Sequence, residues 1–102
     1  MTILAQLVAS KTDSREYTTY VFKCLDNITT QYTEYIMCTR YPNWDHRDIR
    51  IGEVGYLNFE ERLAGIDKWF DGERFINYQY DGIQFVKFIE YQKVPDNDEI
   101  IL

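Results

Sequence analysis

The chain has 102 residues, which is the size of a single domain and too short for two independent hydrophobic cores. Its formal net charge of -6 disfavours binding to polyanions unless the eleven Lys and Arg residues gather on one face. Aromatic residues make up 17% of the chain, and because such side chains suit half-buried strand surfaces, the composition predicts a fold rich in strands.

The first expected element is a strand over residues 3–9, where small or apolar side chains recur at every second position. Leu4 and Val8 make its other face apolar too, so both faces are expected to be buried. This segment lacks the basic leading region and the long apolar run of a signal peptide. No stretch approaches the roughly 20 apolar residues of a membrane helix. We therefore expect a cytoplasmic protein with no membrane partner.

Two further strands are expected in the first half of the chain. Residues 17–25 alternate between apolar and polar positions after a polar break, and residues 35–41 form a β-rich run that ends at Pro42. The three strands together predict a meander. Cys24 and Cys38 fall on adjacent strands of this meander, and without evidence of an oxidising compartment we expect buried thiols rather than a disulfide.

The second half begins with a link over residues 43–48 that is too short and too charged for more than one helical turn. Gly52 and Gly55 then indicate a tight turn, a bulge or a barrel corner at the start of a strand that continues to residue 59 and toward Leu63. Helix content is expected to be low.

Two Asp-Gly pairs, Asp71-Gly72 and Asp81-Gly82, each lie between aromatic-rich runs and are strong hairpin signals. They predict successive antiparallel segments over residues 68–70, 75–80 and 84–91. Pro95 ends the last strand, so residues 1–93 are expected to form one β-barrel domain and residues 94–102 a flexible acidic C-terminal tail.

Short strands separated by turns in a chain of this size predict a small closed antiparallel barrel of five or six strands, because closure removes exposed sheet edges. The predicted order resembles the oligonucleotide/oligosaccharide-binding (OB) fold, and an SH3-like barrel is the alternative. In the OB interpretation, residues 51–57 are similar to the turn into the fourth strand, and residues 84–91 form the closing strand. The usual helix between strands three and four would be reduced to residues 43–48.

Residues 52–89 also resemble small uncharacterised proteins of bacteriophages and related mobile elements of gut bacteria. The segments that carry this likeness are Gly55-Tyr56-Leu57, Ala64-Gly65, Lys68-Trp69-Phe70 and Gln84-Phe85. The resemblance implies a biological setting and no particular activity.

Residue patterns typical of catalytic or metal sites are nearly absent from the sequence. The one histidine, His46, lies in a polar link between Asp45 and Arg47, and no nucleophile has a motif around it. Two cysteines and one histidine without metal-ligand spacing do not make a zinc site, and no phosphate-binding glycine loop occurs. We therefore expect a protein that is not an enzyme and that needs no cofactor or metal.

Aromatic residues near Lys and Arg form the one set of residues that suggests a binding function. Single-stranded nucleic acid binds by stacking its bases on aromatic rings beside a groove of Lys and Arg. The alternative is that these rings are core residues or cross-strand pairs, as in any small barrel. The candidate nucleic-acid-binding residues are Tyr20, Lys23, Tyr35, Arg40, Tyr41, Lys68, Trp69, Arg74 and Tyr78. Tyr17 and Tyr80 belong to the same set of rings.

The C-terminal tail is similar in composition to the acidic, apolar-tipped tails of bacterial single-stranded DNA-binding proteins, which recruit partners. It lacks the Pro-Phe end of that family, so an acidic tail without this role is the alternative. The candidate partner-binding residues are Asp96, Asp98, Glu99, Ile100, Ile101 and Leu102.

The leading hypothesis from the sequence is a non-catalytic module that binds single-stranded nucleic acid in phage or mobile-element replication. The alternative is a structural or protein-interaction accessory protein, such as a virion component or an adaptor, whose aromatic surface meets a protein partner. A mimic of nucleic acid would need the acidic residues on one face, and the sequence shows no such array. The oligomeric state is left open.

Overall fold

The structure is a computed structural model that describes residues 1–25, 34–42, 48–61, 76, 80 and 83–95. The five elements that the structure describes in full are all strands, which confirms the prediction of a mostly β protein. The strands are β1 (Thr2–Thr12), β2 (Thr18–Cys24), β3 (Tyr35–Arg40), β4 (Val54–Glu61) and β5 (Gln84–Lys93).

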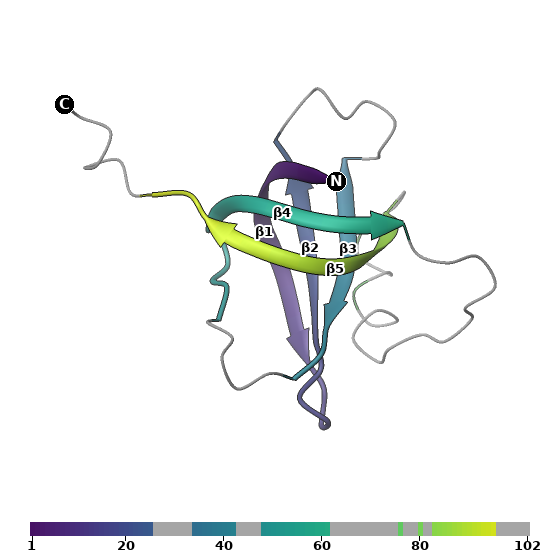
Figure 1. Ribbon diagram of the computed structural model, residues 1–102. Helices are drawn as coiled ribbons and strands as arrows, with labels where there is room; N and C mark the ends of the chain where they lie inside the picture. The colour runs from purple at the N-terminus through teal and green to yellow at the C-terminus, as the bar shows by residue number, and fades with distance from the viewer. Residues whose placement is uncertain (26–33, 43–47, 62–75, 77–79, 81–82, 96–102) are drawn as a thin grey trace.

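The five strands close into a barrel in the order β1-β2-β3-β5-β4, and β4 pairs with β1 to complete the ring. Figure 1 shows β4 and β5 curving across one side of the barrel while β1, β2 and β3 form the other. The expected meander of the first three strands is confirmed, because β2 is antiparallel to both β1 and β3. The small closed barrel is thus confirmed, with five strands.

One strand pair differs from the all-antiparallel expectation. β3 and β5 run parallel, with Ile36 opposite Gln84 and Met37 opposite Phe85. The reason is geometric: a closed ring with an odd number of strands cannot alternate direction at every pairing, so at least one pair must be parallel. β4 pairs with β1, and β5 lies between β3 and β4.

The barrel interior is filled by the side chains at alternate positions of all five strands, as the period of two requires. Ile3, Ala5 and Leu7 come from β1, and all three are essentially fully buried. Burial of each large apolar side chain contributes roughly 1.5–3 kcal/mol, so this cluster is the main source of stability. The other interior residues are Tyr20, Phe22, Ile36, Cys38, Ile49, Leu57, Phe59 and Val86, with Cys24, Phe88 and Tyr91 packed against them.

A β-bulge interrupts β1 between Leu7 and Ala9 and changes which way its side chains face. Leu7 pairs with Phe22 in the barrel interior. Ala9 pairs with Val21 instead, and Ala9 and Val21 belong to a second cluster outside the barrel. A bulge bends a strand and increases its twist, which helps a short sheet to close.

Of the two glycines around the start of β4, Gly52 lies in the tight turn that the sequence predicts, whereas Gly55 lies in a regularly paired part of the strand rather than at a bulge. Gly52 has a φ of 91° in a turn, and its amide donates to the Leu7 carbonyl at 2.8 Å. Gly55 lies within β4 and is buried. Cys24 and Cys38 form no disulfide, as expected. Burial, and then the Glu34 carboxylate, raise the pKa of the Cys24 thiol, which keeps it protonated at neutral pH.

The expected segments over residues 68–70 and 75–80 and both Asp-Gly turns lie wholly or mostly outside the described residues, as do residues 43–47 of the short link. The last strand, expected over residues 84–91, is confirmed and runs on to Lys93. Beyond it, the Val94 amide donates to the Val54 carbonyl at 3.1 Å, and residues 96–102 of the expected tail lie outside the described part.

Candidate functional site

The outer face of β2 and β3 carries a column of paired side chains. The register places Thr19 opposite Thr39, Val21 opposite Met37 and Lys23 opposite Tyr35. One step beyond the Thr18–Arg40 pair, Tyr17 and Tyr41 continue the column, and their ring centroids are 5.3 Å apart. The column therefore runs from an aromatic pair at one end to a Lys–Tyr pair at the other.

The middle of this column is closed to solvent although it lies outside the barrel. Val21 and Met37 are both 0% exposed, because other parts of the chain cover them. The residues packed over them include Ile76, which is buried with them, and the partly buried Tyr80, Ile83 and Phe85. Apolar burial on this outer face therefore forms a second small core next to the barrel core.

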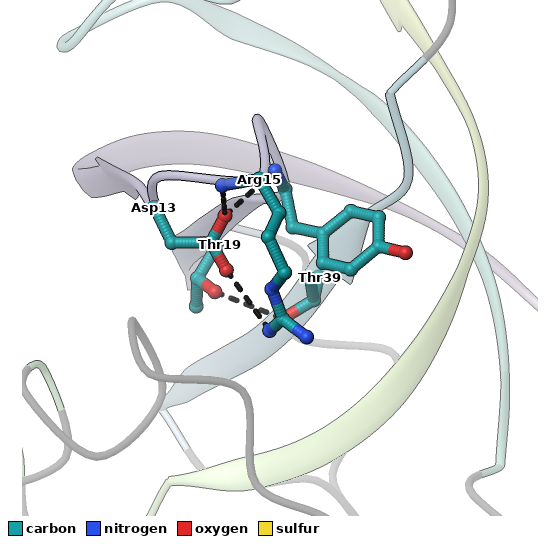
Figure 2. A network of polar contacts seen from close by, with 5 residues as sticks. Asp13, Arg15, Thr19 and Thr39 are labelled. Atoms are coloured by element: carbon teal, nitrogen blue, oxygen red, sulfur yellow. Dashed lines mark hydrogen bonds and ion pairs between the residues drawn. The ribbon is translucent and has the colours of Figure 1, made fainter.

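The Thr19–Thr39 pair extends the closed region toward the aromatic end. Its hydroxyl oxygens are 2.9 Å apart, and the two residues are 1% and 8% exposed. Figure 2 shows the pair beside the turn that joins β1 to β2. Two buried hydroxyls that bond to each other avoid most of the cost of losing water. The closed part of the column thus covers two successive outward pairs.

The aromatic end of the column is open. Tyr41 is 60% exposed and meets Tyr17 in an edge-to-face arrangement with an interplanar angle of 87°. The guanidinium carbon of Arg15 lies over the Tyr17 ring, 4.8 Å from its centroid, so one face of Tyr17 already holds a cation. An exposed ring beside a cation is the combination that stacks a nucleobase and holds its phosphate.

In the turn between β1 and β2, contacts with Asp13 hold Arg15 over the Tyr17 ring. The Asp13 carboxylate accepts hydrogen bonds from the backbone amides of Arg15 at 2.8 Å and Tyr17 at 3.1 Å, and from the Arg15 guanidinium at 3.2 Å. Figure 2 shows these three contacts converging on Asp13. Partial burial raises the pKa of Asp13, but these hydrogen bonds and the Arg15 charge outweigh it and lower that pKa below its ordinary value.

The charge around the aromatic end is mixed. Lys11 is exposed and pairs with Thr19 across β1 and β2, which places a second cation beside the column. Glu16 in the turn and Asp48 before β4 are exposed carboxylates at the same end of the barrel. Among the described residues, the cations Arg15 and Lys11 therefore share this end of the barrel with carboxylates and do not form a long basic groove.

Two of the residues predicted from the sequence, Tyr20 and Arg40, lie at this end of the barrel but face its interior. Tyr20 is 4% exposed and packs against Phe22 and Phe88, so its ring is not on the candidate surface. Burial raises the pKa of the Tyr20 hydroxyl, although the neighbouring guanidinium opposes this. Arg40 donates to that hydroxyl at 3.2 Å and lies over the Phe88 ring at 5.2 Å.

Lys23 and Tyr35 lie at the other end of the column. Lys23 forms an ion pair with Glu34 at 3.7 Å, and the Tyr35 ring packs on Tyr80 with centroids 5.0 Å apart. Tyr41 is thus the one residue of the predicted set, within the described chain, that presents an exposed ring. The remaining candidates lie outside the described residues: Lys68, Trp69, Arg74, Tyr78, Asp96, Asp98, Glu99, Ile100, Ile101 and Leu102.

Sequence reasoning missed Arg15 and Lys11, which it treated as part of a polar break. The signal was present, because Asp13 two residues before Arg15 is typical of a turn in which the carboxylate binds nearby amides. Such a turn brings its side chains next to the strands that it joins. Tyr17 was recognised as one of the aromatic residues but not as a partner of Tyr41.

In the part of the chain that the structure describes, no three His, Cys, Asp or Glu side chains gather as metal ligands. No helix among the described residues is long and apolar enough to cross a membrane. Comparison of the chain with protein-family models, with curated proteins and with solved structures found no match.

Proposed function

We propose that this chain is a non-catalytic binding module that holds single-stranded nucleic acid at the Tyr17–Tyr41 end of the β2–β3 outer face. The observation that carries the proposal is the exposed ring of Tyr41, packed edge-to-face with Tyr17 while Arg15 covers Tyr17. A base stacked on Tyr41 would place its phosphates near Arg15 and Lys11. Stacking on an exposed ring contributes about 1–3 kcal/mol per base.

The arrangement of the strands supports the same proposal. The order β1-β2-β3-β5-β4 closes on β1, and β4 returns from β3 across the barrel to pair with β1, as in a five-stranded Greek-key barrel of the OB type. Barrels of that type bind oligonucleotides on strands 2 and 3 and on the loops beside them. The Tyr17–Tyr41 pair and the Asp13–Tyr17 turn occupy this position. The resemblance of residues 52–89 extends the proposal to phage or mobile-element replication in a bacterial cytoplasm.

The test is fluorescence anisotropy with a labelled single strand of about 20 nucleotides at low and moderate salt. Tyr41→Ala should weaken binding by about tenfold or more, because it removes the stacking ring. The matched control is Tyr56→Ala, since Tyr56 is also exposed, at 48%, but lies on β4. The control should bind like the unchanged protein.

A second pair of variants tests the cation. Arg15→Gln should weaken binding and reduce its dependence on salt, whereas Lys87→Gln, at an exposed position on β5, should change neither. If the unchanged protein fails to bind at low salt, or if Tyr41→Ala and Tyr56→Ala bind alike, the proposal is wrong. The search would then turn to protein partners, with pull-down experiments on the full chain.

A further inference from the structure

Asp13 uses its two carboxylate oxygens for two separate tasks (Figure 2). Oδ1 accepts hydrogen bonds from the backbone amides of Arg15 at 2.8 Å and Tyr17 at 3.1 Å, and these bonds fix the turn between β1 and β2. Oδ2 accepts from the Arg15 guanidinium at 3.2 Å. One oxygen therefore shapes the backbone, and the other holds the cation that lies over the Tyr17 ring.

The two side chains of this ion pair differ greatly in exposure. The Arg15 side chain is 59% exposed, whereas the Asp13 side chain is 6% exposed. A ligand at the surface can therefore reach the guanidinium directly, while the carboxylate is largely covered. Asp13 can affect a bound phosphate through its charge or through the position of Arg15.

These two effects have opposite signs. The negative charge of Asp13 repels a phosphate, so on charge alone its removal should strengthen binding. The contact with Asp13 holds the Arg15 side chain in one arrangement, and a side chain that is ordered before binding loses less conformational entropy when the phosphate arrives. Arginine has among the largest rotamer freedoms of any side chain, and salt screens exposed charges within about 10 Å at 0.1 M, so the effect of position is expected to dominate.

We propose that Asp13 is a positioning residue of the binding site, which strengthens the binding of single-stranded nucleic acid by holding Arg15 beside the stacked base. It does so although its own charge repels the ligand. This inference rests on the proposed function and adds to it the residue that orders the phosphate-binding cation.

Glu16 offers a comparison within the same turn. It is an exposed carboxylate, and its backbone amide donates to the Asp13 carbonyl at 3.0 Å. Removing its charge lessens the repulsion of a phosphate and leaves the contact between Asp13 and Arg15 in place. Charge alone therefore predicts the same direction of change at Asp13 and Glu16, whereas the positioning role predicts opposite directions.

The experiment compares Asp13→Asn with Glu16→Gln in the full chain, by fluorescence anisotropy with a labelled single strand of about 20 nucleotides. The oxygen of Asn is needed by the two backbone amides, so its NH2 group faces the guanidinium, and a donor then meets a donor. Asp13→Asn should weaken binding about threefold or more and reduce the salt slope by up to about 0.7, the share of one phosphate. Glu16→Gln should strengthen binding about twofold at low salt.

A second background shows whether Asp13 acts through Arg15. In a chain that already carries Arg15→Gln, Asp13→Asn should no longer weaken binding, because the cation that it positions is gone. Circular dichroism and urea denaturation show that each variant is folded under the conditions of the binding assay.

The outcomes separate this inference from the proposed function. If Asp13→Asn leaves binding unchanged or strengthens it as Glu16→Gln does, Asp13 does not position the cation, and the proposed function stands. An equal loss with and without Arg15→Gln would show that Asp13 acts through the fold, and it would also overturn the inference. If the unchanged protein does not bind, or if Tyr41→Ala and Tyr56→Ala bind alike, the inference and the proposed function are both wrong.

Discussion

The ring of Tyr91 lies directly against the Cα of Gly55 inside the barrel, where a Cβ on residue 55 would overlap the ring carbons and the hydroxyl. Tyr91 cannot easily move away, because its other neighbours include the Phe22 ring, stacked at a centroid distance of 5.7 Å. This contact explains why a glycine occupies a buried position of β4. The contact also brings the β4 backbone at Gly55 close to the Tyr91 side chain of β5.

The first prediction concerns this contact. Gly55→Ala should lower the free energy of unfolding by about 1–3 kcal/mol, the usual cost of overpacking a core. Urea denaturation followed by fluorescence measures the change. Combining Gly55→Ala with Tyr91→Leu should cost less than the sum of the two single changes, because the smaller side chain leaves room for the methyl group. Additive costs would show that the two residues do not compete for space.

The second prediction concerns the buried hydroxyl pair on the outer face. Thr19→Val or Thr39→Val alone should each cost about 1–3 kcal/mol, because each removes one partner of a buried hydrogen bond. The double change should cost less than the sum, since it removes both partners of that bond together. A double-mutant cycle in urea measures the coupling, and a coupling of zero would mean that this bond adds nothing to stability.

The third prediction concerns Glu16, which has a φ of 70° in the turn before β2. A residue with a Cβ is strained in this left-handed region, whereas glycine is not. Glu16→Gly should therefore raise the free energy of unfolding by about 0.5–1 kcal/mol. Ser14→Gly is the matched control, because Ser14 lies in the same turn without a positive φ. It should be neutral or destabilising, and equal effects of both changes would contradict the explanation.

The fourth prediction follows from the lowered pKa of Asp13. Its ordinary value is 3.8, and the folded value is lower because the amides of Arg15 and Tyr17 and the guanidinium bind the charged carboxylate. The charged form therefore adds stability above about pH 4, and this contribution is lost as the pH falls through the folded pKa. Asp13→Asn keeps the side-chain shape and an acceptor oxygen but removes the charge.

Urea denaturation from about pH 2 to pH 7 tests this sign. The unchanged protein should be more stable than Asp13→Asn at neutral pH, and the difference should shrink as the pH falls through the acid range. A difference that stays constant with pH would mean that the carboxylate charge is not what stabilises the turn. The same series on Glu60→Gln, an exposed strand residue, is the control.

Several elements could be predicted from the sequence because their signals are local. Alternation of apolar residues identified β1 and β2, and a β-rich run that ends at Pro42 identified β3. Gly52 indicated the turn before β4, where its φ of 91° suits a residue without a Cβ. The sequence also has no catalytic spacing around His46.

The candidate site was harder to predict, because alternation shows that neighbouring side chains face opposite ways but not which face other segments cover. Tyr20 lies in β2 and Tyr41 directly follows β3, yet Tyr20 faces the barrel interior and Tyr41 faces solvent. Val21 and Met37 face outward and are still buried, because residues from beyond β4 pack on them. No local pattern contains that information.

By itself the sequence determined that the chain forms a small β barrel with a polar break over residues 11–16 between its first two strands, since strand periods and breaks act over a few neighbours. The tertiary structure alone decided that β3 and β5 run parallel, because this depends on closing a ring of five strands. It also decided that Tyr17, with Arg15 over its ring, packs against Tyr41 at the exposed end of the β2–β3 column. That meeting joins residues 24 or more positions apart, and only the pairing of β2 with β3 brings them together.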